Sequence, residues 1–586
     1  MRTRAGTTPW PADVADRYRA EGLWQGRTLG DAFAEAARDH AERIALVDDG
    51  VALTYAEVHD RVEACAARLI DAGLAPDDRV VVQLPNHWTF VVLTFACLRA
   101  GIVPVMALPA HREHELRHLV AASEAVALVA PDTLRDFDHL GLARTLRASS
   151  PTLRQLIVLV SGADARGSCS PDAGTSDVSS SVTDQPGTGH PDTEHPDTVS
   201  LTALCAPSDE RTRGRTLPTP DADDVAVFLL SGGTTGLPKL IARTHDDYLC
   251  NIVLTSPPSA VDRDTVYLAT LPMGHNFPLA CPGTLGTLLA GGTVVPLGSP
   301  RPERAFAAIE RHGVTHTAAV PAVVASWLDH AGAVGFDALR SLRVLQVGGA
   351  RLADELAERV VRGLPGTLQQ VFGMAEGLIN VTRLDDPVEA IVGTQGRPVS
   401  PFDELRVVDE TTGLEVAPGE PGVLLTRGPY TPRGYYDAPD VNARSFTPDG
   451  FYITGDIVRQ RPDGNLVVAG RSKDMINRGG ENISAEEVEN LVYGLASVRL
   501  AAAVAMPHDT LGETVCLFAV LHDGHALDLG SVRAHFDRAG VAAFKRPDHL
   551  VTVDELPLTK VGKIDKKALR ERLIAEPTAS EGRLVR

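Results

Sequence analysis

Apolar positions in the first part of the chain alternate between two periods. Residues 55–69 and 90–99 repeat apolar side chains at helical spacing, whereas residues 79–84 and 102–108 are short apolar runs typical of buried strands. This alternation predicts α/β layering around a largely parallel sheet. The pattern resumes after residue 225 and continues to about residue 470. A compact segment beyond residue 471, with strands expected at 501–504 and 515–521, predicts a small second domain.

Residues 161–223 interrupt this pattern. They are rich in Ser, Thr, Asp, Gly and Pro and contain no Phe, Tyr or Trp, so they are too polar to bury a core. We predict a disordered low-complexity insertion here. Two histidines in the near-repeat at residues 190–198, His190 and His195, could suggest a metal site. A solvated duplication is the favoured interpretation, because nothing rigid would hold the ligands.

Length and charge narrow the class of protein. The 586 residues exceed the size of one hydrophobic core, and 44% apolar with 23% charged residues is a globular composition. The formal net charge of -20 disfavours nucleic acid polymers and anionic membranes as partners. Residues 91–110, the most apolar stretch, are broken by Arg99 and Pro104 and cannot span a membrane. With no recognisable secretory signal and seven scattered cysteines, we expect reduced thiols in a cytoplasmic protein.

The strongest local signal lies at residues 229–239, where an apolar strand runs into small and hydroxyl residues that end at Lys239. Glycines let backbone N–H groups approach an anion, hydroxyls add donors and lysine adds a charge, so this loop suits a polyphosphate. It is not a Walker loop, because Pro238 precedes the lysine and Leu240 follows it. Alone, such a loop is equally well a surface turn.

Four further clusters follow in order, at residues 369–377, 452–456, 470–483 and 557–566. Each alone has an ordinary explanation as a solvated glutamate, a turn or a lysine-rich surface. In joint order and spacing, the five motifs resemble the adenylate-forming superfamily of acyl- and aryl-CoA synthetases, luciferases and peptide-synthetase adenylation domains. The resemblance covers nearly the whole chain apart from the insertion.

This resemblance implies the adenylate-forming fold, which is α/β. Residues 1–472 would form a large N-terminal domain of layered sheets in several subdomains, which binds ATP and the acid substrate. Residues 473–586 would form a small mobile α+β domain that carries the catalytic lysine. The resemblance also implies ATP and Mg²⁺ as the cofactors.

Site residues follow from the same resemblance. The loop from Ser231 to Lys239 would wrap the β- and γ-phosphates, Glu376 and Thr235 would hold Mg²⁺, and Asp456 and Arg471 would hold the ribose. The full nucleotide-binding set is Ser231, Gly232, Gly233, Thr234, Thr235, Gly236, Lys239, Gly349, Ala350, Val371, Phe372, Gly373, Met374, Asp456 and Arg471.

The implied reaction has two parts. A carboxylate attacks the α-phosphate to give acyl-AMP and pyrophosphate, while Lys563 stabilises the developing charge. The small domain then rotates about the hinge residue Lys473 and presents the Gly479–Gly480 loop for attack by a thiol on the acyl group. Closing the domains excludes water from the mixed anhydride.

Substrate choice should depend on residues 274–283. Amino-acid-activating relatives carry an aspartate at the position of Asn276, where it pairs with the substrate ammonium group. A neutral amide disfavours an amino acid and can bond a phenolic hydroxyl instead. Phe277 offers an aromatic face and Gly348, Gly349 and Ala350 a thin opposite wall, which together make a slot for a flat ring.

The resemblance then narrows to the aryl-acid AMP ligases of siderophore biosynthesis. It rests on residues 8–11, 108–112, 243–248, 275–279 and 427–431. It implies that His275 lies close to the substrate carboxylate and phosphate, as a catalytic residue beside Lys563 and Glu376. The adjacent His245, Asp246 and Asp247 could suggest a metal site, but neighbours on one segment rarely converge on one ion.

Two acids dominate that family, salicylate and 2,3-dihydroxybenzoate. Dihydroxybenzoate enzymes typically carry Ser at the position of Cys281 and Val at that of Ile379. A thiol is a weak partner for the 3-hydroxyl and a larger side chain fills its space, so both departures favour salicylate. Cys281 and Ile379 as mere packing variants stay an alternative.

The leading hypothesis is a salicylate-AMP ligase that loads the phosphopantetheine thiol of an aryl carrier protein. Alternatives within the enzyme class are a 2,3-dihydroxybenzoate-AMP ligase and an aryl-CoA ligase. No carrier serine motif is evident after residue 567, so the carrier would be a separate chain or domain. A non-catalytic nucleotide sensor on the same fold is the alternative from another class. It is disfavoured because a sensor needs no acyl-transfer lysine, whereas the chain retains Lys239, Glu376, Asp456, Arg471 and Lys563 together.

Overall fold

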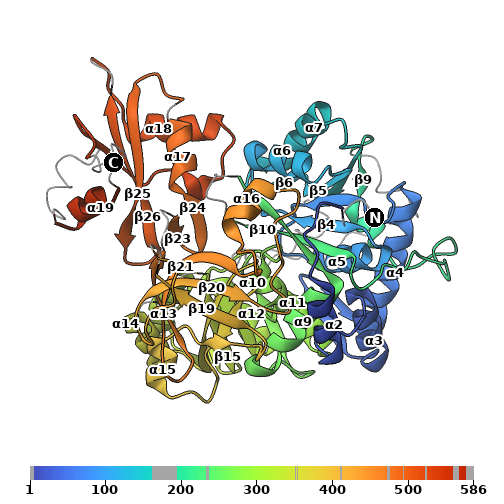
Figure 1. Ribbon diagram of the computed structural model, residues 1–586. Helices are drawn as coiled ribbons and strands as arrows, with labels where there is room; N and C mark the ends of the chain where they lie inside the picture. Colours follow the sequence, from blue (N-terminus) through green and yellow to red (C-terminus); the bar gives the residue numbers. More distant parts are fainter. Residues whose placement is uncertain are drawn as a thin grey trace, which may run out of the picture.

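Two large sheets and a small separate domain make up the computed structural model of the chain (Figure 1). The structure describes residues 5–160, 195–231, 237–349, 351–352, 354–409, 412–471, 475–492, 494–521, 524–557 and 566–575. Within these ranges, no helix has the length and apolar character that crossing a membrane requires. The six cysteines in the same ranges are free and buried.

The first sheet has nine strands in the order β18-β17-β16-β15-β14-β12-β13-β1-β2, and its six central strands from β16 to β1 are parallel. The strands are β1 Ile44–Asp48, β2 Val51–Thr54, β12 Val266–Ala269, β13 Thr293–Pro296, β14 His316–Ala319, β15 Val344–Gly348, β16 Thr367–Gly373, β17 Ile379–Val381 and β18 Arg397–Pro398. One face packs against α12 Pro302–His312, α13 Pro321–Val334, α14 Asp354–Gly363 and α15 Val388–Gly393. Because side chains alternate along a strand, the other face is left for a second helical layer.

The second sheet has seven strands in the order β11-β10-β4-β3-β5-β8-β9, all parallel except β11. These strands are β3 Arg79–Val82, β4 Val103–Met106, β5 Ala127–Pro131, β8 Gln155–Leu159, β9 Val199–Ser200, β10 Val225–Ser231 and β11 Lys239–Thr244. Its outer face packs against α6 Glu113–Ala122 and α7 His139–Ser149. The predicted alternation of helices and strands over residues 55–108 is confirmed.

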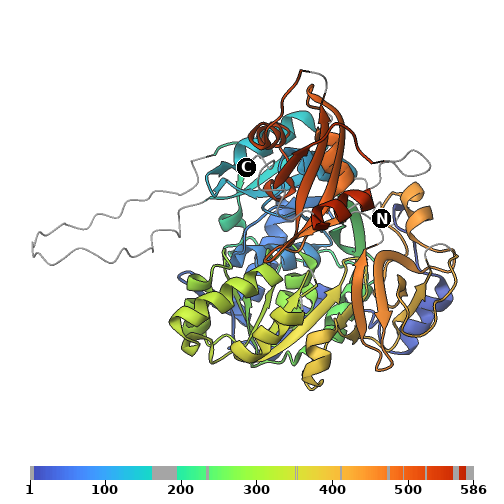
Figure 2. The same cartoon turned by 90° about the vertical axis from the view of Figure 1, so that its left-hand side faces the viewer.

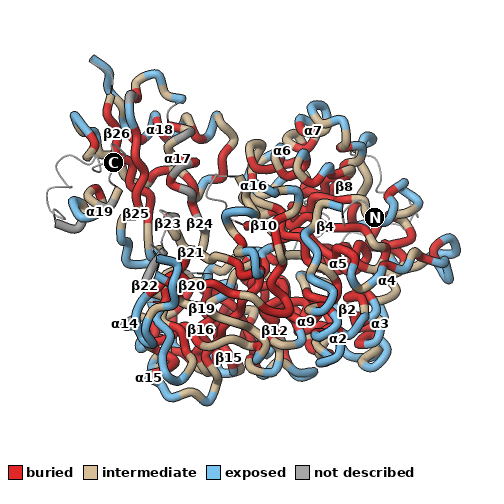
Figure 3. Tube along the Cα trace, viewed as in Figure 1, coloured by how far each residue is buried: buried red, intermediate tan, exposed pale blue. Residues whose placement is uncertain are grey.

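A helical layer lies between the two sheets. It comprises α3 Leu29–Asp39, α4 Tyr55–Asp71, α5 Trp88–Ala100, α9 His245–Thr255 and α11 Gly283–Leu289. All but one of the residues of α5 are buried, which explains its apolar character on every face. Figure 3 shows the buried trace concentrated in this layer and in the strands on either side of it.

The predicted extent of the insertion is corrected at its C-terminal end. Residues 161–194 lie outside the described residues, but residues 195–223 are described and contribute to the fold. β9 pairs with β8 in the second sheet, and the short helix α8 Leu201–Leu204 follows. Leu201, Leu204 and Leu217 are buried, so a few apolar side chains in a polar background suffice to anchor this segment.

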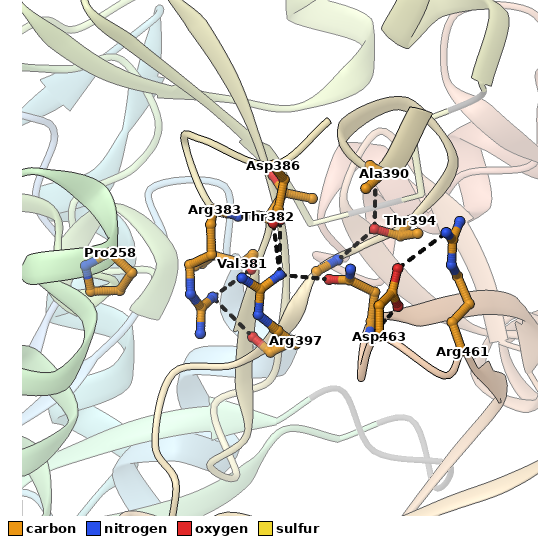
Figure 4. A network of polar contacts seen from close by, with 12 residues as sticks. Pro258, Val381, Thr382, Arg383, Asp386, Ala390, Thr394, Arg397, Arg461 and Asp463 are labelled. Atoms are coloured by element: carbon orange, nitrogen blue, oxygen red, sulfur yellow. Dashed lines mark hydrogen bonds and ion pairs between the residues drawn. The ribbon is translucent and has the colours of Figure 1, made fainter. Parts of the chain in front are cut away.

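A four-stranded antiparallel sheet covers the end of the first sheet. Its strands are β19 Glu404–Val408, β20 Gly422–Arg427, β21 Tyr452–Gln460 and β22 Leu466–Arg471. A polar network braces the edge where the two sheets meet (Figure 4). Arg383 donates to the carbonyl oxygens of Val381 and Pro398 at 2.6 and 2.7 Å, and Arg397 pairs with Asp386 at 2.9 Å. These contacts hold β17 and β18 in place.

The small C-terminal domain lies at the upper left of the body in Figure 1 and at the top in Figure 2. Its strands are β23 Met475–Arg478, β24 Glu481–Ser484, β25 Val498–His508, β26 Gly512–Leu521 and β27 His549–Thr552, and its helices are α17 Ala485–Val492, α18 Leu529–Arg538 and α19 Lys566–Ala575. The domain has its own apolar core. Both strands predicted here, at 501–504 and 515–521, are confirmed as parts of β25 and β26.

The remaining elements are short. They are α2 Ala12–Ala20, β6 Thr133–Leu134, β7 Phe137–Asp138, η1 Pro257–Ser259, α10 Asn276–Ala280, η2 Asp337–Leu339, α16 Pro439–Ser445 and η3 Ala543–Lys545. Two of them, α10 and η3, matter for the site.

Candidate active site

A cavity of about 660 Å³ opens where the carboxyl ends of β12, β15 and β16 point. Neighbouring parallel strands all end on one edge of a sheet, and the loops that follow them gather there. The second sheet contributes the ends of β10 and β11, and β21 contributes the opposite wall. Four of the five sequence motifs therefore line one cavity, whereas of the fifth, at residues 557–566, only Pro557 and Lys566 lie within the described residues.

The predicted polyphosphate loop connects two paired strands of the second sheet. Ser231 ends β10 and Lys239 begins β11, and the two residues lie opposite each other in the antiparallel register. Both line the cavity. The Lys239 ammonium group lies 4.9 Å from the ring centroid of Tyr435, in a cation–π contact. Residues 232–236, the glycine and threonine part of the loop, lie outside the described residues.

Glu376 lies in the turn after β16 and is only 5% exposed, yet it lines the cavity. The Tyr435 hydroxyl donates to Glu376 Oε1 at 2.8 Å and lies 3.1 Å from the Tyr452 hydroxyl. Burial, with the Glu376 carboxylate next in effect, raises the pKa of Tyr435, which keeps this phenol a donor. Arg243 donates to the carbonyl oxygen of Ala375 at 3.2 Å and so fixes the same turn from behind.

Asp456 lies on β21, directly opposite Arg471 of β22. The Asp456 side chain lines the cavity and the residue is 6% exposed, while its backbone N–H donates to the Thr454 hydroxyl at 3.0 Å. A carboxylate in this position faces the same space as Lys239 and Glu376.

His275 is the N-cap of α10 and lines the cavity together with the first residues of that helix. Its Nδ1 accepts a hydrogen bond from the Phe277 backbone N–H at 3.3 Å. Burial lowers the pKa of His275, so the ring is neutral near pH 7. With Nδ1 occupied as an acceptor, the proton sits on Nε2, which can donate to an oxyanion.

Asn276 is held by two buried side chains. The Tyr248 hydroxyl donates to Asn276 Oδ1 at 2.9 Å, and Asn276 Nδ2 donates to Cys281 Sγ at 3.4 Å. Burial raises the pKa of Cys281 to about 12, so it is a neutral thiol. An amide nitrogen has two protons, and only one is used by Cys281. The pocket around Asn276 is therefore neutral and keeps a donor for a ligand.

The walls of this pocket are close together. A Cβ atom at Gly348 would lie 2.7 Å from the Val371 carbonyl oxygen and 3.2 Å from Phe277 Cε1, so only glycine fits there. Gly349 has a φ of +82°. Ile379 on β17 is fully buried and lies opposite Gly373. Phe277 and Ile379 both line the cavity, so they form a narrow apolar slot in the same cavity as Lys239, Glu376 and Asp456.

Most of the predicted site residues meet at this cavity. Those lining it are Ser231, Lys239, His275, Asn276, Phe277, Cys281, Gly349, Val371, Phe372, Gly373, Met374, Glu376, Ile379, Asp456 and Gly480. Gly348 and Gly479 are direct neighbours of this set in the chain, and the backbone of Arg471 pairs with that of Asp456. Gly232, Gly233, Thr234, Thr235, Gly236, Ala350, Lys473 and Lys563 lie outside the described residues.

The small domain closes one side of the same cavity. Gly480, Glu481, Glu487, Phe544 and Lys545 line it. Asn477 Nδ2 donates to the Gly349 carbonyl oxygen at 3.3 Å, which joins the loop at 479–480 to the wall of the aryl slot. In this arrangement of the domains, the predicted thiolation loop faces the cavity.

The residues suggested as an alternative metal site point to different partners. His245 Nδ1 accepts from the Leu29 backbone, Asp246 from the Gly26 backbone, and Asp247 pairs with Arg243 at 2.5 Å. Across the described ranges, no group of three or more His, Cys, Asp or Glu side chains is arranged to hold a metal ion. These three residues anchor α9 instead.

Several residues of the site were missed by sequence reasoning. Tyr248 orients Asn276, Tyr435 and Tyr452 hold Glu376, and Glu487 and Lys545 line the cavity from the small domain. Tyr248 and Tyr452 lie in segments that carried the family resemblance, which was a usable signal. The other three gave none, since a lone tyrosine, glutamate or lysine is ordinary anywhere.

Comparison with known proteins assigns the class of this fold and site. Residues 33–436 match the family described as AMP-binding enzyme, and residues 487–563 match the AMP-binding enzyme C-terminal domain. The chain belongs to this family, and the predicted adenylate-forming superfamily and fold class are confirmed.

Individual relatives are similar over nearly their whole length. A salicylyl-CoA synthase / salicylate adenylyltransferase from Streptomyces sp is 53% identical, over 97% of this chain and 98% of the relative. A 2-hydroxy-7-methoxy-5-methyl-1-naphthoate–CoA ligase from Streptomyces carzinostaticus is 51% identical, over 97% of each. A salicyl-AMP ligase / salicyl-S-ArCP synthetase from Mycobacterium tuberculosis is 46% identical, over 97% of this chain and 94% of the relative.

Proposed function

We propose that the protein activates salicylate with ATP to salicyl-AMP and pyrophosphate, and then transfers the salicyl group to a phosphopantetheine thiol. The observation that carries the proposal is the shared cavity, which has Lys239, Glu376 and Asp456 at one side and the neutral Asn276 pocket at the other. Such a cavity brings a nucleotide and an aromatic acid into contact.

In the first step, a carboxylate oxygen of the acid attacks the α-phosphorus of ATP and pyrophosphate leaves. Lys239 binds the leaving polyphosphate, and Asp456 accepts hydrogen bonds from the ribose hydroxyls. The Nε2–H group of His275 donates to the carboxylate and the α-phosphate, which orients the attack. Lys563 is assigned by resemblance to stabilise the charge on the transferring group.

The chemistry of Glu376 fits a magnesium ion. It is a buried carboxylate held in place by the Tyr435 hydroxyl, and oxygen donors are the ligands that Mg²⁺ prefers. Glu376, with Thr235 by resemblance, would hold the ion, which when bound neutralises charge on the phosphates. Tyr435 and Arg243 keep the carboxylate aimed at the cavity whether or not the ion is present.

We assign Asn276 to bind the ring hydroxyl that neighbours the carboxylate of the aryl acid substrate. Salicylate has a hydroxyl at that position, and the names of the two Streptomyces relatives both describe 2-hydroxy aryl acids. The spare proton of Asn276 Nδ2 can donate to this hydroxyl. An α-amino acid is disfavoured, because Asn276 and the side chains that hold it, Tyr248 and Cys281, are neutral and offer a buried ammonium group no charge partner.

Cys281 favours salicylate over 2,3-dihydroxybenzoate. Its neutral thiol is a weak hydrogen-bond partner and already accepts from Asn276, so an additional 3-hydroxyl would lose its water without a good replacement. Discrimination against an added hydroxyl in such a pocket is often only ~10²-fold, so weak use of dihydroxybenzoate is expected.

In the second step, the thiol attacks the acyl carbon and AMP leaves. The loop at Gly479–Gly480 faces the cavity in this arrangement, which supports its assignment as the thiolation loop. An aryl carrier protein is the proposed acceptor and CoA the alternative, since the names of the relatives include both.

ATP–pyrophosphate exchange tests the first step. We expect exchange with salicylate, weaker exchange with 2,3-dihydroxybenzoate and benzoate, and none with amino acids. An Asp456→Asn variant should lose most of it, whereas Asp528→Asn, which changes an N-cap of the small domain, should not. Absence of exchange with any aryl acid would overturn the proposal, and a preference for dihydroxybenzoate would overturn the argument from Cys281. Transfer to CoA and to a pantetheinylated aryl carrier protein is then compared directly.

A further inference from the structure

The small domain also contacts the body at helix α6, next to the cavity wall that Glu487 and Lys545 form. Gly540 of the small domain packs so closely on α6 that a Cβ atom there would lie 3.1 Å from Glu113 Cβ. The Ala542 backbone N–H donates to Glu115 Oε1 at 3.4 Å. This contact joins residues more than 400 positions apart in the chain, and it includes a charged side chain with no access to solvent.

Three charged side chains meet at the centre of this contact. Lys545 Nζ donates to Glu115 Oε1 at 3.1 Å and to Glu487 Oε1 at 2.9 Å. The exposed fractions of the side chains are 7% for Lys545, 0% for Glu115 and 6% for Glu487. Glu115 belongs to the body, whereas Lys545 and Glu487 both belong to the small domain. We call these three residues the interdomain triad.

Glu115 is ionised in this setting. Burial alone would raise the pKa of Glu115, but Lys545, His111 and the Arg112 backbone N–H together bring the pKa below its ordinary value. The other titratable groups that face the triad include His114, whose Nε2 lies 3.6 Å from Glu487 Oε1, Arg112 beside His111, and Glu481 of the small domain, which interacts with Lys545. A carboxylate that loses its water needs such partners, and two of them, the Lys545 ammonium group and the Ala542 N–H, come from the small domain.

The contact between the domains therefore depends on Glu115. The Lys545–Glu487 pair lies within the small domain and moves with it as a unit. Glu115 finds Lys545 and the Ala542 N–H only when the small domain lies against α6. In any arrangement that separates the two, Glu115 returns to water and loses these bonds.

The interdomain triad is connected through the chain to the Gly479–Gly480 loop, which faces the cavity. Gly480 leads into β24, and β24 leads directly into α17, which carries Glu487. Docking of Lys545 and Glu487 on α6 and docking of Asn477 on Gly349 are therefore two ends of one rigid contact. Glu115 itself does not line the cavity, although its partner Lys545 does, so a change at Glu115 alters the population of this arrangement while every lining side chain is kept.

We propose that Glu115 is a positioning residue that, through the interdomain triad, selects the domain arrangement in which the Gly479–Gly480 loop faces the cavity. The inference rests on the proposed function, in which this arrangement serves the thiol step and a rotated one serves adenylation. Loss of the Glu115 charge then slows transfer to the thiol and leaves adenylation intact.

The test uses an isosteric change with a matched control. Glu115 also accepts from the Arg112 N–H at the start of α6, a role that Gln fills equally, so Glu115→Gln keeps the helix cap. Glu57 occupies the same capping position on α4, far from the small domain, and Glu57→Gln is the control. Each variant is assayed for pyrophosphate exchange with salicylate and for transfer from preformed salicyl-AMP to pantetheine.

We expect Glu115→Gln to lower the transfer rate about tenfold, as a charge-assisted bond becomes a neutral one, while exchange stays within twofold. Glu57→Gln should change neither. Adding Lys545→Met to Glu115→Gln should lower transfer by much less than Lys545→Met does alone. Equal loss of exchange and transfer, or unchanged transfer, overturns the proposal.

A distance measurement tests the triad without any activity. Dyes attached at Val334→Cys on the body and Leu500→Cys on the small domain, both exposed positions, report the domain arrangement by energy transfer once Cys169 is replaced by serine. The six other cysteines are buried. Glu115→Gln should shift the distance distribution and Glu57→Gln should not. An unchanged distance distribution would overturn the proposed role of the triad even if the protein activates salicylate. A shifted distribution in a protein without pyrophosphate exchange would overturn only the proposed substrate chemistry.

Discussion

Replacing Tyr248 by phenylalanine tests how the pocket binds the ring hydroxyl of the aryl acid substrate. The change removes the donor to Asn276 Oδ1 at 2.9 Å and leaves a buried amide oxygen without a partner. Such an unsatisfied group costs about 1–3 kcal/mol, which corresponds to roughly a 5- to 150-fold loss in kcat/KM. The ring itself remains, so the Arg243 guanidinium, now 4.8 Å from its centroid, keeps its contact and the fold should survive.

The expected loss is specific to acids that carry the hydroxyl. Without Tyr248, the Asn276 amide is no longer held with Nδ2 toward the slot, so kcat/KM for salicylate should fall much more than that for benzoate. Pyrophosphate exchange with both acids measures the ratio. Tyr267→Phe is the control, because its hydroxyl is buried without a hydrogen-bond partner among the described residues, and its loss should be neutral. Equal losses for salicylate and benzoate, or no loss, would refute the assignment of Asn276.

Three further changes test other parts of the structure. Cys281→Ser should raise the use of 2,3-dihydroxybenzoate relative to salicylate in exchange assays, and an unchanged ratio would mean that this side chain does not meet the 3-position. Gly480→Ala should slow thiol transfer at least about tenfold with exchange retained, since φ is +92° and the new Cβ would lie 2.9 Å from Val320 Cγ1; Gly479→Ala, whose nearest neighbour is at 3.4 Å, should have a smaller effect. Burial raises the pKa of Asp403 to about 7, so the folded protein binds a proton that the unfolded chain releases near pH 4, and stability should fall as pH rises from 4 to 7. Asp403→Asn should flatten this slope, which approaches ~1.4 kcal/mol per pH unit, in denaturant titrations at several pH values.

Strongly periodic elements could be predicted from the sequence. The helix α5 and the strands β3 and β4 were predicted nearly to their ends, because complete burial leaves an unbroken apolar run. The segment at 195–223 was not, since β9 and α8 place only isolated leucines among polar residues. A short strand makes its backbone hydrogen bonds with any side chains, so composition is a poor guide there.

The same contrast holds for the site. Residues in contiguous motifs, such as His275 and Glu376, could be predicted from the joint order of the motifs and the family resemblance, and both line the cavity. Tyr435 reaches Glu376 across 59 positions and Lys545 reaches Glu115 across 430, and only the fold brings these pairs together. Long-range hydrogen bonds leave no local period, which is why the residues that orient the site were missed.

The parallel pairing of β8 with β9 has a consequence for engineering. Ile157 lies opposite Val199 in one sheet, so both ends of the intervening stretch are anchored by strand hydrogen bonds. Closing a longer connection between fixed ends costs only ~0.6 kcal/mol for each doubling of its length. A reporter domain with adjacent termini, inserted within residues 161–194, should therefore be carried by the enzyme with little loss of stability, on the side of the second sheet remote from β10 and β11.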